Sequence, residues 1–149
     1  MLQCCSGEPS PALERKLQAL YDRFEDGDRA QGIPPAKPMR RREWLDNLLA
    51  APGVGVVVHH EGRVVGHGRL LGDGDGTAEL AIFVDPAYRG TGVGTELLGT
   101  LLSVGRNRGL SRVVLSVERS NTPAVNLYRR FSFEAANYGR YELEMERPL

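Results

Sequence analysis

The residues with the clearest chemical potential lie in one glycine-rich segment, Val84-Asp85-Pro86-Ala87-Tyr88-Arg89-Gly90-Thr91-Gly92-Val93-Gly94-Thr95. The segment follows an apolar, strand-like run and precedes a run with helical periodicity. Alternating glycines let the backbone curl so that successive N–H groups point into one concavity, and the first amides of the following helix add partial positive charge. A phosphate or pyrophosphate is the ligand that such a site favours, and Arg89 would add a fixed charge beside it.

Two common phosphate-binding motifs do not fit this segment. A P-loop requires Gly-x-x-x-x-Gly-Lys followed by serine or threonine, and the segment contains no lysine. A dinucleotide-binding turn requires glycine at the sixth position, which is Thr95 when counted from Gly90. A loop that only lets the chain turn is the simpler alternative. Three glycines and Arg89 between a strand and a helix favour the phosphate site.

Hydrophobic periodicity predicts the elements that must position this segment. We expect helices at residues 12–25, 44–49, 92–109 and 123–131, and strands at residues 54–58, 63–71, 78–84, 112–118 and 140–146. The first three strands form an antiparallel meander, whereas the helix that follows the third requires a parallel crossover to the fourth. The predicted fold class is α+β, with a mixed central sheet flanked by helices in one domain spanning residues 1–149.

Composition limits the class of protein. Of the 149 residues, 41% are hydrophobic and 26% are charged, as in soluble globular proteins. Basic and acidic residues number 19 each, so no overall field favours nucleic acid or a membrane as partner. The adjacent Cys4 and Cys5 cannot form a disulfide framework, which favours a reducing compartment. No run reaches the length of a signal peptide or the roughly 20 residues of a membrane helix, so we expect a cytoplasmic location.

A second motif follows the first, and together they resemble those of the GCN5-related N-acetyltransferase (GNAT) superfamily. The family's coenzyme motif is matched by Arg89, Gly92 and Gly94 after Val84-Asp85-Pro86, and its second motif by Asn121, Ala124, Leu127 and Tyr128. The order of elements agrees over nearly the whole chain, and the core motifs occupy residues 78–133. The family usually has glycine where this chain has Ser132, so we expect a locally altered backbone there.

The resemblance implies the acyl-CoA N-acyltransferase fold and acetyl-CoA as co-substrate. The pantetheine arm would lie along the strand ending at Val84, with the pyrophosphate on the glycine turn. The implied coenzyme-binding residues are Ile82, Phe83, Val84, Arg89, Gly90, Thr91, Gly92, Val93, Gly94, Thr95, Asn121, Ala124 and Tyr128.

Catalytic roles follow from the same resemblance. Tyr128 matches the residue that protonates the leaving thiolate; alternatively it only fills the core. Glu79 is a candidate general base if burial raises its pKa, and otherwise a solvated strand residue. Asn121 caps a helix, contacts the coenzyme, or does both. Asn126 and Arg130 either approach the phosphates or lie on the surface.

No metal site is expected. Asp73-Gly74-Asp75-Gly76 lacks the later ligands of a calcium loop and is interpreted as a hairpin turn. His59, His60 and His67 lie on early strands without further metal ligands nearby, and His67 is a candidate acceptor-site base.

We therefore expect an N-acetyltransferase that moves acetyl from acetyl-CoA directly to a primary amine of a small molecule or peptide. The alternatives are a catalytically silent acyl-CoA-binding sensor and a nucleotide-binding domain. The acceptor would be shaped by the first two helices, the loop at residues 26–39 and the last strands. Residues 40–42, all arginine, are expected on a solvated face or against the coenzyme or an acidic acceptor. A homodimer is possible through residues 140–146, if that strand lies at a sheet edge.

Overall fold

The computed structural model describes residues 2–5, 9–29, 33–72 and 75–149. Its helices and 3-10 turns are α1 (Pro11–Asp22), η1 (Asp26–Asp28), α2 (Pro38–Ala50), η2 (Pro86–Tyr88), α3 (Val93–Asn107) and α4 (Thr122–Arg130). Its strands are β1 (Leu2–Cys5), β2 (Gly53–His60), β3 (Arg63–Leu71), β4 (Thr77–Val84), β5 (Arg112–Glu118), β6 (Glu134–Tyr138) and β7 (Glu142–Pro148). They form one sheet in the order β1-β2-β3-β4-β5-β7-β6.

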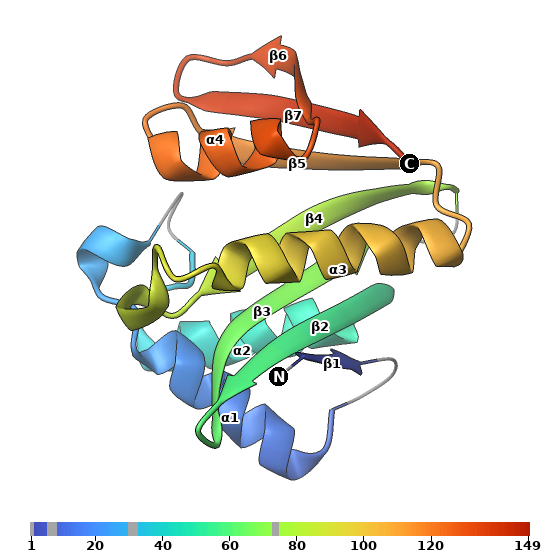
Figure 1. Cartoon of the computed structure of the whole chain (residues 1–149). Helices are drawn as coiled ribbons and strands as arrows, with labels where there is room; N and C mark the ends of the chain where they lie inside the picture. The colour runs from blue at the N-terminus through green and yellow to red at the C-terminus, as the bar shows by residue number, and fades with distance from the viewer. Residues whose placement is uncertain (1, 6–8, 30–32, 73–74) are drawn as a thin grey trace.

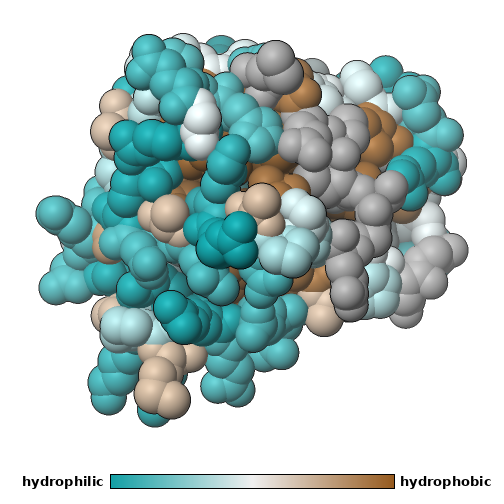
Figure 2. Space-filling view, turned by 90° about the horizontal axis from the view of Figure 1, so that it is seen from below, coloured by the Kyte–Doolittle hydropathy of each residue, from teal (hydrophilic) through white to brown (hydrophobic). Residues whose placement is uncertain are grey.

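The sheet is mixed and helices cover both of its faces, which confirms the α+β prediction. Strands β4 and β5 pair in parallel, as the crossover through α3 requires, and the meander β2-β3-β4 is antiparallel. Helices α1 and α2 lie on one face, and α3 lies on the other (Figure 1). Seen from below, the surface is largely hydrophilic, with apolar residues showing between the polar ones (Figure 2).

The side chains of β2 and β3 alternate between the two faces of the sheet and pack into two separate apolar cores. Val57 and Val64 pack with the buried leucines of α1 in one cluster, whereas Val56 and Val65 pack with those of α3 in the other. Because successive side chains of a strand point to opposite faces, β2 and β3 contribute to both cores and are buried almost along their whole length. The sheet is therefore a rigid central layer on which the site is built.

Four sequence-based expectations differ from the structure. Strands β1 and β6 were not expected; β6 is mostly exposed and lacks an apolar alternation that would have indicated it. The last strand begins at Glu142, and Tyr141 before it is 72% exposed rather than half-buried. This strand is not at the edge, because β7 lies between β5 and β6.

Ser132 has a φ of 67°, so the backbone keeps a left-handed conformation and is not altered there. The expected turn at residues 73–76 falls partly outside the described residues.

Strands β4 and β5 pair only briefly. The paired residues are Thr77–Glu79 of β4 and Arg112–Val114 of β5. Beyond them β4 pairs with β3, and β5 pairs with β7. The two strands diverge toward the end at which α3 begins (Figure 1). Within the described residues, the last part of β4 therefore has no strand partner on its β5 side.

The alternation of main-chain hydrogen bonds between β3 and β4 shows which main-chain groups of β4 face that open side. The Asp85 N–H donates to the Val65 carbonyl at 2.8 Å, and Val84 lies opposite Gly66 in the register. In an antiparallel pair, adjacent residues point their N–H and C=O groups alternately toward and away from the partner strand. The groups of Ile82 and Val84 therefore point away from β3, toward the side that β5 has left.

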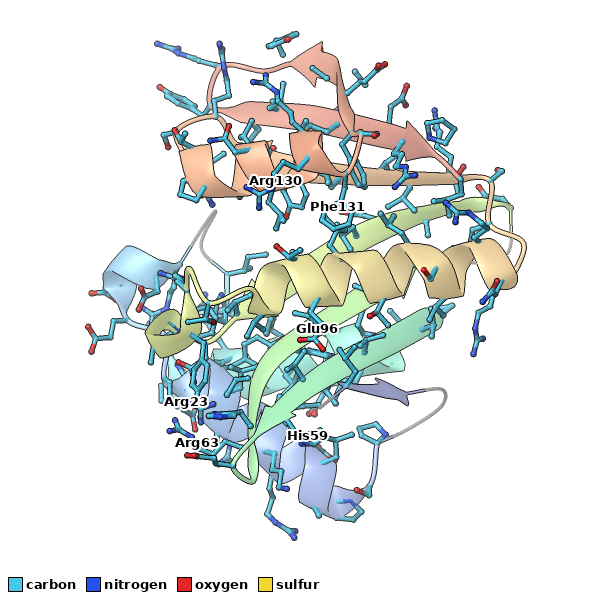
Figure 3. All side chains as sticks on the ribbon, viewed as in Figure 1. Arg23, His59, Arg63, Glu96, Arg130 and Phe131 are labelled. Carbon is cyan, nitrogen blue, oxygen red and sulfur yellow. The ribbon has the colours of Figure 1, made fainter. Side chains whose placement is uncertain are left out.

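Small residues let α4 close over the diverging strands. A Cβ on Gly94 would lie 3.4 Å from Leu127 Cδ2 and 3.7 Å from Val84 Cγ2. A Cβ on Gly99 would lie 3.6 Å from the ring of Phe131, which points from the end of α4 toward α3 (Figure 3). Leu127 and Phe131 are one helical turn apart, and each packs on α3 at a glycine, Leu127 at Gly94 and Phe131 at Gly99. This contact holds the two halves of the sheet together.

A buried carboxylate fixes the end of β4. Asp85 is 1% exposed, and its Oδ2 lies 2.6 Å from Nε of Arg23. Its Oδ1 accepts a hydrogen bond from the Ala87 N–H at 2.9 Å. Arg23 also donates to the Val64 carbonyl at 2.7 Å. One side chain thus joins the end of α1, the start of β3 and the entry to the glycine turn.

Replacing this carboxylate should destabilise the protein. We expect Asp85→Asn to lower the free energy of unfolding by about 2 kcal/mol, because hydrogen bonds to charged groups contribute about 1.5–3 kcal/mol. Urea denaturation measures the change. The control is Asp22→Asn, because Asp22 pairs with Arg41 at 2.7 Å but its side chain is 58% exposed; it should cost less than about 1 kcal/mol. Equal losses in the two variants would contradict this role of Asp85.

Candidate functional site

The glycine turn forms an open cradle at the start of α3. Gly90 and Gly92 have φ values of 74° and 92°, which favour glycine. A Cβ on either would meet no atom within 4 Å, so the space in front of the turn is open. Gly92 is the N-cap of α3 and supplies no side-chain cap, so the amides of residues 93–95 have no partner within the helix. The turn can therefore accept an anion.

The guanidinium group of Arg89, which was expected beside the glycine turn, forms an ion pair with another segment. Nη1 of Arg89 lies 2.7 Å from Oδ1 of Asp28 in η1, and its guanidinium lies 5.9 Å from the ring centroid of Phe24. A hydrogen bond from the main chain of Glu25, followed by Arg89, lowers the pKa of Asp28. Arg89 thus joins the glycine turn to the segment between α1 and α2.

The end of β4 lies between the two cores. Ile82 and Val84 pack against the core that contains α3, whereas Phe83 packs against the core that contains α1 and α2. The ring of Phe83 lies 5.3 Å from those of both Tyr21 and Trp44. Ile82, Phe83 and Val84 are each only half-buried. The unpaired edge of β4 at these residues is therefore accessible from both faces of the sheet.

Helix α4 supplies the predicted tyrosine and asparagine. Oδ1 of Asn121 accepts a hydrogen bond from the Ala124 N–H at 3.3 Å, which confirms the capping role of Asn121. Tyr128 is 7% exposed, and its ring lies 5.8 Å from that of Phe133. Burial raises the pKa of Tyr128 to about 12, so its hydroxyl keeps its proton at neutral pH. The side chain fills the core and remains able to donate a proton or a hydrogen bond.

The other predicted residues vary in position. Around the turn, Val93 is buried, Gly94 is half-buried, and Thr91 and Thr95 are exposed. Asn126 and Arg130 lie exposed on α4. Glu79 is exposed and is the last β4 residue paired with β5. Its exposure agrees with the second of the two alternatives expected for it, a solvated strand residue.

His67 is not placed to serve as an acceptor-site base. It is 3% exposed, and its Nδ1 lies 2.6 Å from the hydroxyl oxygen of Tyr21. Burial, followed by the charge of Arg69, lowers the pKa of His67 to about 3. A neutral ring closed off from solvent cannot exchange protons with an incoming amine. The expectation is wrong because α1 covers β3, which strand periodicity alone does not indicate.

Two contacts near the turn were not expected from the sequence. Nδ1 of His60 lies 2.7 Å from the hydroxyl oxygen of Tyr88, which braces the β2–β3 hairpin against η2. Arg89 pairs with Asp28 as described. Both contacts join segments far apart in the chain, and no local pattern indicates either of them.

The described part of the chain offers neither a cluster of metal ligands nor a membrane-spanning helix. Among the described residues, His, Cys, Asp and Glu side chains form no group of three or more that could hold a metal ion. None of the helices in the described ranges combines the length and the hydropathy that a membrane span requires.

Known proteins resemble the chain in sequence and in fold. Residues 17–133 match the Acetyltransferase (GNAT) family. The chain is 41% identical over 128 residues to a mycothiol acetyltransferase of Thermobifida fusca, covering 82% of this chain and 39% of that protein. It is 31% identical over 107 residues to an L-methionine sulfoximine/L-methionine sulfone acetyltransferase of Pseudomonas aeruginosa, covering 67% of this chain and 62% of that protein.

A solved structure extends the likeness to the fold. A GNAT superfamily phosphinothricin acetyltransferase of Sinorhizobium meliloti, in complex with AcCoA, superposes with a TM-score of 0.76 at 20% identity. The match covers 100% of this chain and 88% of that chain. At this identity the likeness concerns the fold alone, and the chain spans less than two thirds of the length of the two relatives above. Because the family match covers most of its sequence, the chain belongs to the Acetyltransferase (GNAT) family.

Proposed function

We propose that the chain is an acetyl-CoA-dependent N-acetyltransferase that acts on a primary amine of a small molecule or peptide. The observation that carries the proposal is that the unpaired edge of β4 and the open glycine turn lie end to end. One extended ligand with an amide-containing arm and a diphosphate would contact both. Family membership supports acetyl transfer, and both relatives are acetyltransferases by name.

Each part of the coenzyme has a matching part of the chain. The pyrophosphate would bind the amides of residues 90–95 at the positive end of α3. The pantetheine arm would pair with the main-chain groups of Ile82 and Val84, as a peptide adds to an exposed sheet edge. Phe83 and Ala124 would contact the arm from opposite sides. Arg89 would supply positive charge to the diphosphate while it holds η1.

The proposed reaction is a direct transfer. The amine nitrogen attacks the thioester carbonyl carbon, a C–N bond forms, and the C–S bond breaks. A main-chain N–H of β4 would polarise the carbonyl oxygen. The thiolate takes a proton from the Tyr128 hydroxyl, because burial also raises the proton affinity of an uncompensated thiolate. The attacking nitrogen loses one proton as the amide forms, and that proton returns the tyrosinate to its neutral form through solvent. The amine would enter in its neutral form, and the exposed Glu79 would not be required as a base.

The first prediction from this proposed function tests the open cradle formed by the glycine turn at the start of α3. Gly92→Ala should weaken acetyl-CoA binding about tenfold, because a left-handed conformation costs an L-residue about 1–2 kcal/mol and the turn would relax. Isothermal titration calorimetry measures the affinity. The matched control is Gly109→Ala, since Gly109 has a φ of 83° with no atom within 4 Å of a Cβ but lies beyond the other end of α3. Equal loss of affinity in both variants would contradict the site, as would the absence of binding in the unsubstituted protein.

The second prediction tests the donor. Tyr128→Phe should lower kcat about 100-fold and leave acetyl-CoA affinity unchanged, because a positioned acid contributes about 10²–10⁴-fold. Thiol release across a panel of amines measures turnover. The exposed Tyr141→Phe is the control and should behave like the unsubstituted protein.

The pH dependence provides an independent check of the donor. Because the pKa of Tyr128 is raised to about 12, the acid form persists through pH 10. We therefore expect no loss of kcat with an apparent pKa near 10. Such a loss in the unsubstituted protein but not in Tyr128→Phe would contradict the assignment of a buried donor. Coenzyme binding without thiol release would instead support a silent sensor.

A further inference from the structure

A basic cavity lies between α1 and the β2–β3 hairpin, apart from the glycine turn. Its volume is about 350 Å³, and its charged lining consists of Arg15, Lys16, Arg23 and Arg63. Ala12 and Ala19 of α1 form part of its apolar lining. The cavity shares no residue with the glycine turn. A second ligand could therefore bind here independently of the coenzyme.

The cavity concentrates positive charge on a chain whose net charge is +0. All four charged residues of its lining are basic, and Glu14 and Glu61 lie close in sequence but do not line it. The only carboxylate that pairs with the four basic side chains within the described residues is that of Asp85, which lies 2.6 Å from Arg23 and 3.7 Å from Arg63. One of four charges is thus offset, and three remain for a ligand.

Two of the guanidinium groups are already oriented. Asp85 and the Val64 carbonyl fix Arg23, and Arg63 adjoins the same carboxylate from the hairpin (Figure 3). Oriented guanidinium groups match the oxygens of a phosphoryl group well, because their N–H donors form a rigid fork. Because Asp85 is buried, it holds these groups without entering the cavity itself.

The other two cations are available. Arg15, Ala19 and Arg23 are each one helical turn apart and form a stripe on the α1 surface that faces the hairpin. Arg15 and Lys16 are exposed and form no ion pair with any described residue. Burial, followed by the charge of Lys16, lowers the pKa of the nearby His59, which agrees with a positive potential at this surface.

We propose that this basic cavity binds a small molecule that carries a diphosphate or triphosphate group. Three positive charges of the cavity remain uncompensated. A ligand with one carboxylate would neutralise only one of them, whereas the negative charge of a diphosphate is comparable to all three. A volume of 350 Å³ lies at the lower end of the range of small-molecule pockets, about 300–1,000 Å³. The diphosphate could belong to inorganic pyrophosphate or to a nucleotide, and the experiment below separates the two.

The test is calorimetry on the full chain saturated with coenzyme A, which occupies the glycine turn. Inorganic pyrophosphate and ATP are titrated separately at low ionic strength. We expect one binding event that Lys16→Glu weakens about tenfold, because a charge reversal replaces attraction by repulsion. Stronger binding of ATP than of pyrophosphate would identify a nucleotide, whereas equal affinities would identify the diphosphate group alone.

The matched control is Arg106→Glu, which makes the same charge change on the exposed surface of α3. It should leave pyrophosphate affinity unchanged. Equal weakening in both variants, or no heat with well-folded protein, would overturn the proposal. If coenzyme A does not bind, the titrations are run without it. The comparison of Lys16→Glu with Arg106→Glu then still decides the second site, so its failure and the failure of the proposed function are distinguishable.

Discussion

The structure depends on the separation of two parallel strands. β4 and β5 pair over three residues on each strand and then diverge, so β4 keeps a free edge at the end where α3 begins. A free edge inside a sheet normally invites a strand, because its N–H and C=O groups need partners. Here the same end of β4 leads into the glycine turn, after which the amides of residues 93–95 also lack a partner within their helix. The two sets of unpaired main-chain groups define one continuous surface for a long, polar ligand.

Three contacts maintain the divergence and the turn. Helix α4 packs on α3 at Gly94 and Gly99, which keeps the β5 half attached although its strand has left β4. Asp85 joins α1, β3 and η2, and Arg89 joins the turn to η1 through Asp28. Because Asp85 also orients Arg23 and Arg63, the same carboxylate shapes both the entry to the glycine turn and the proposed phosphate cavity. The end of the molecule that carries the glycine turn is thus held together by charged side chains of distant segments.

Local patterns predicted much of this architecture. The three alternating glycines indicated a tight turn, and the leucine periodicity indicated the helix α3 that follows it. Asn121 before Pro123 indicated a cap, because an asparagine side chain there reaches the first free amides. The parallel crossover followed from element order alone. These features are encoded in neighbouring residues, where spacing and chemistry can be compared directly.

The remaining features depend on contacts between distant segments. β6 has no apolar alternation because most of its side chains are exposed, and it forms only because β7 offers an edge. His67 was expected near the acceptor, but α1 covers it. The pairing of Arg89 with Asp28 and the convergence of Arg23 and Arg63 on Asp85 join residues that only tertiary packing brings together.

The most direct test of the coenzyme site is to record backbone amide NMR spectra while coenzyme A is added to the full chain. We expect the largest shift changes at residues 82–84 and 90–95, with small changes in β2 and β7. Saturable changes confined to other elements, or none in a folded protein at millimolar coenzyme A, would contradict it.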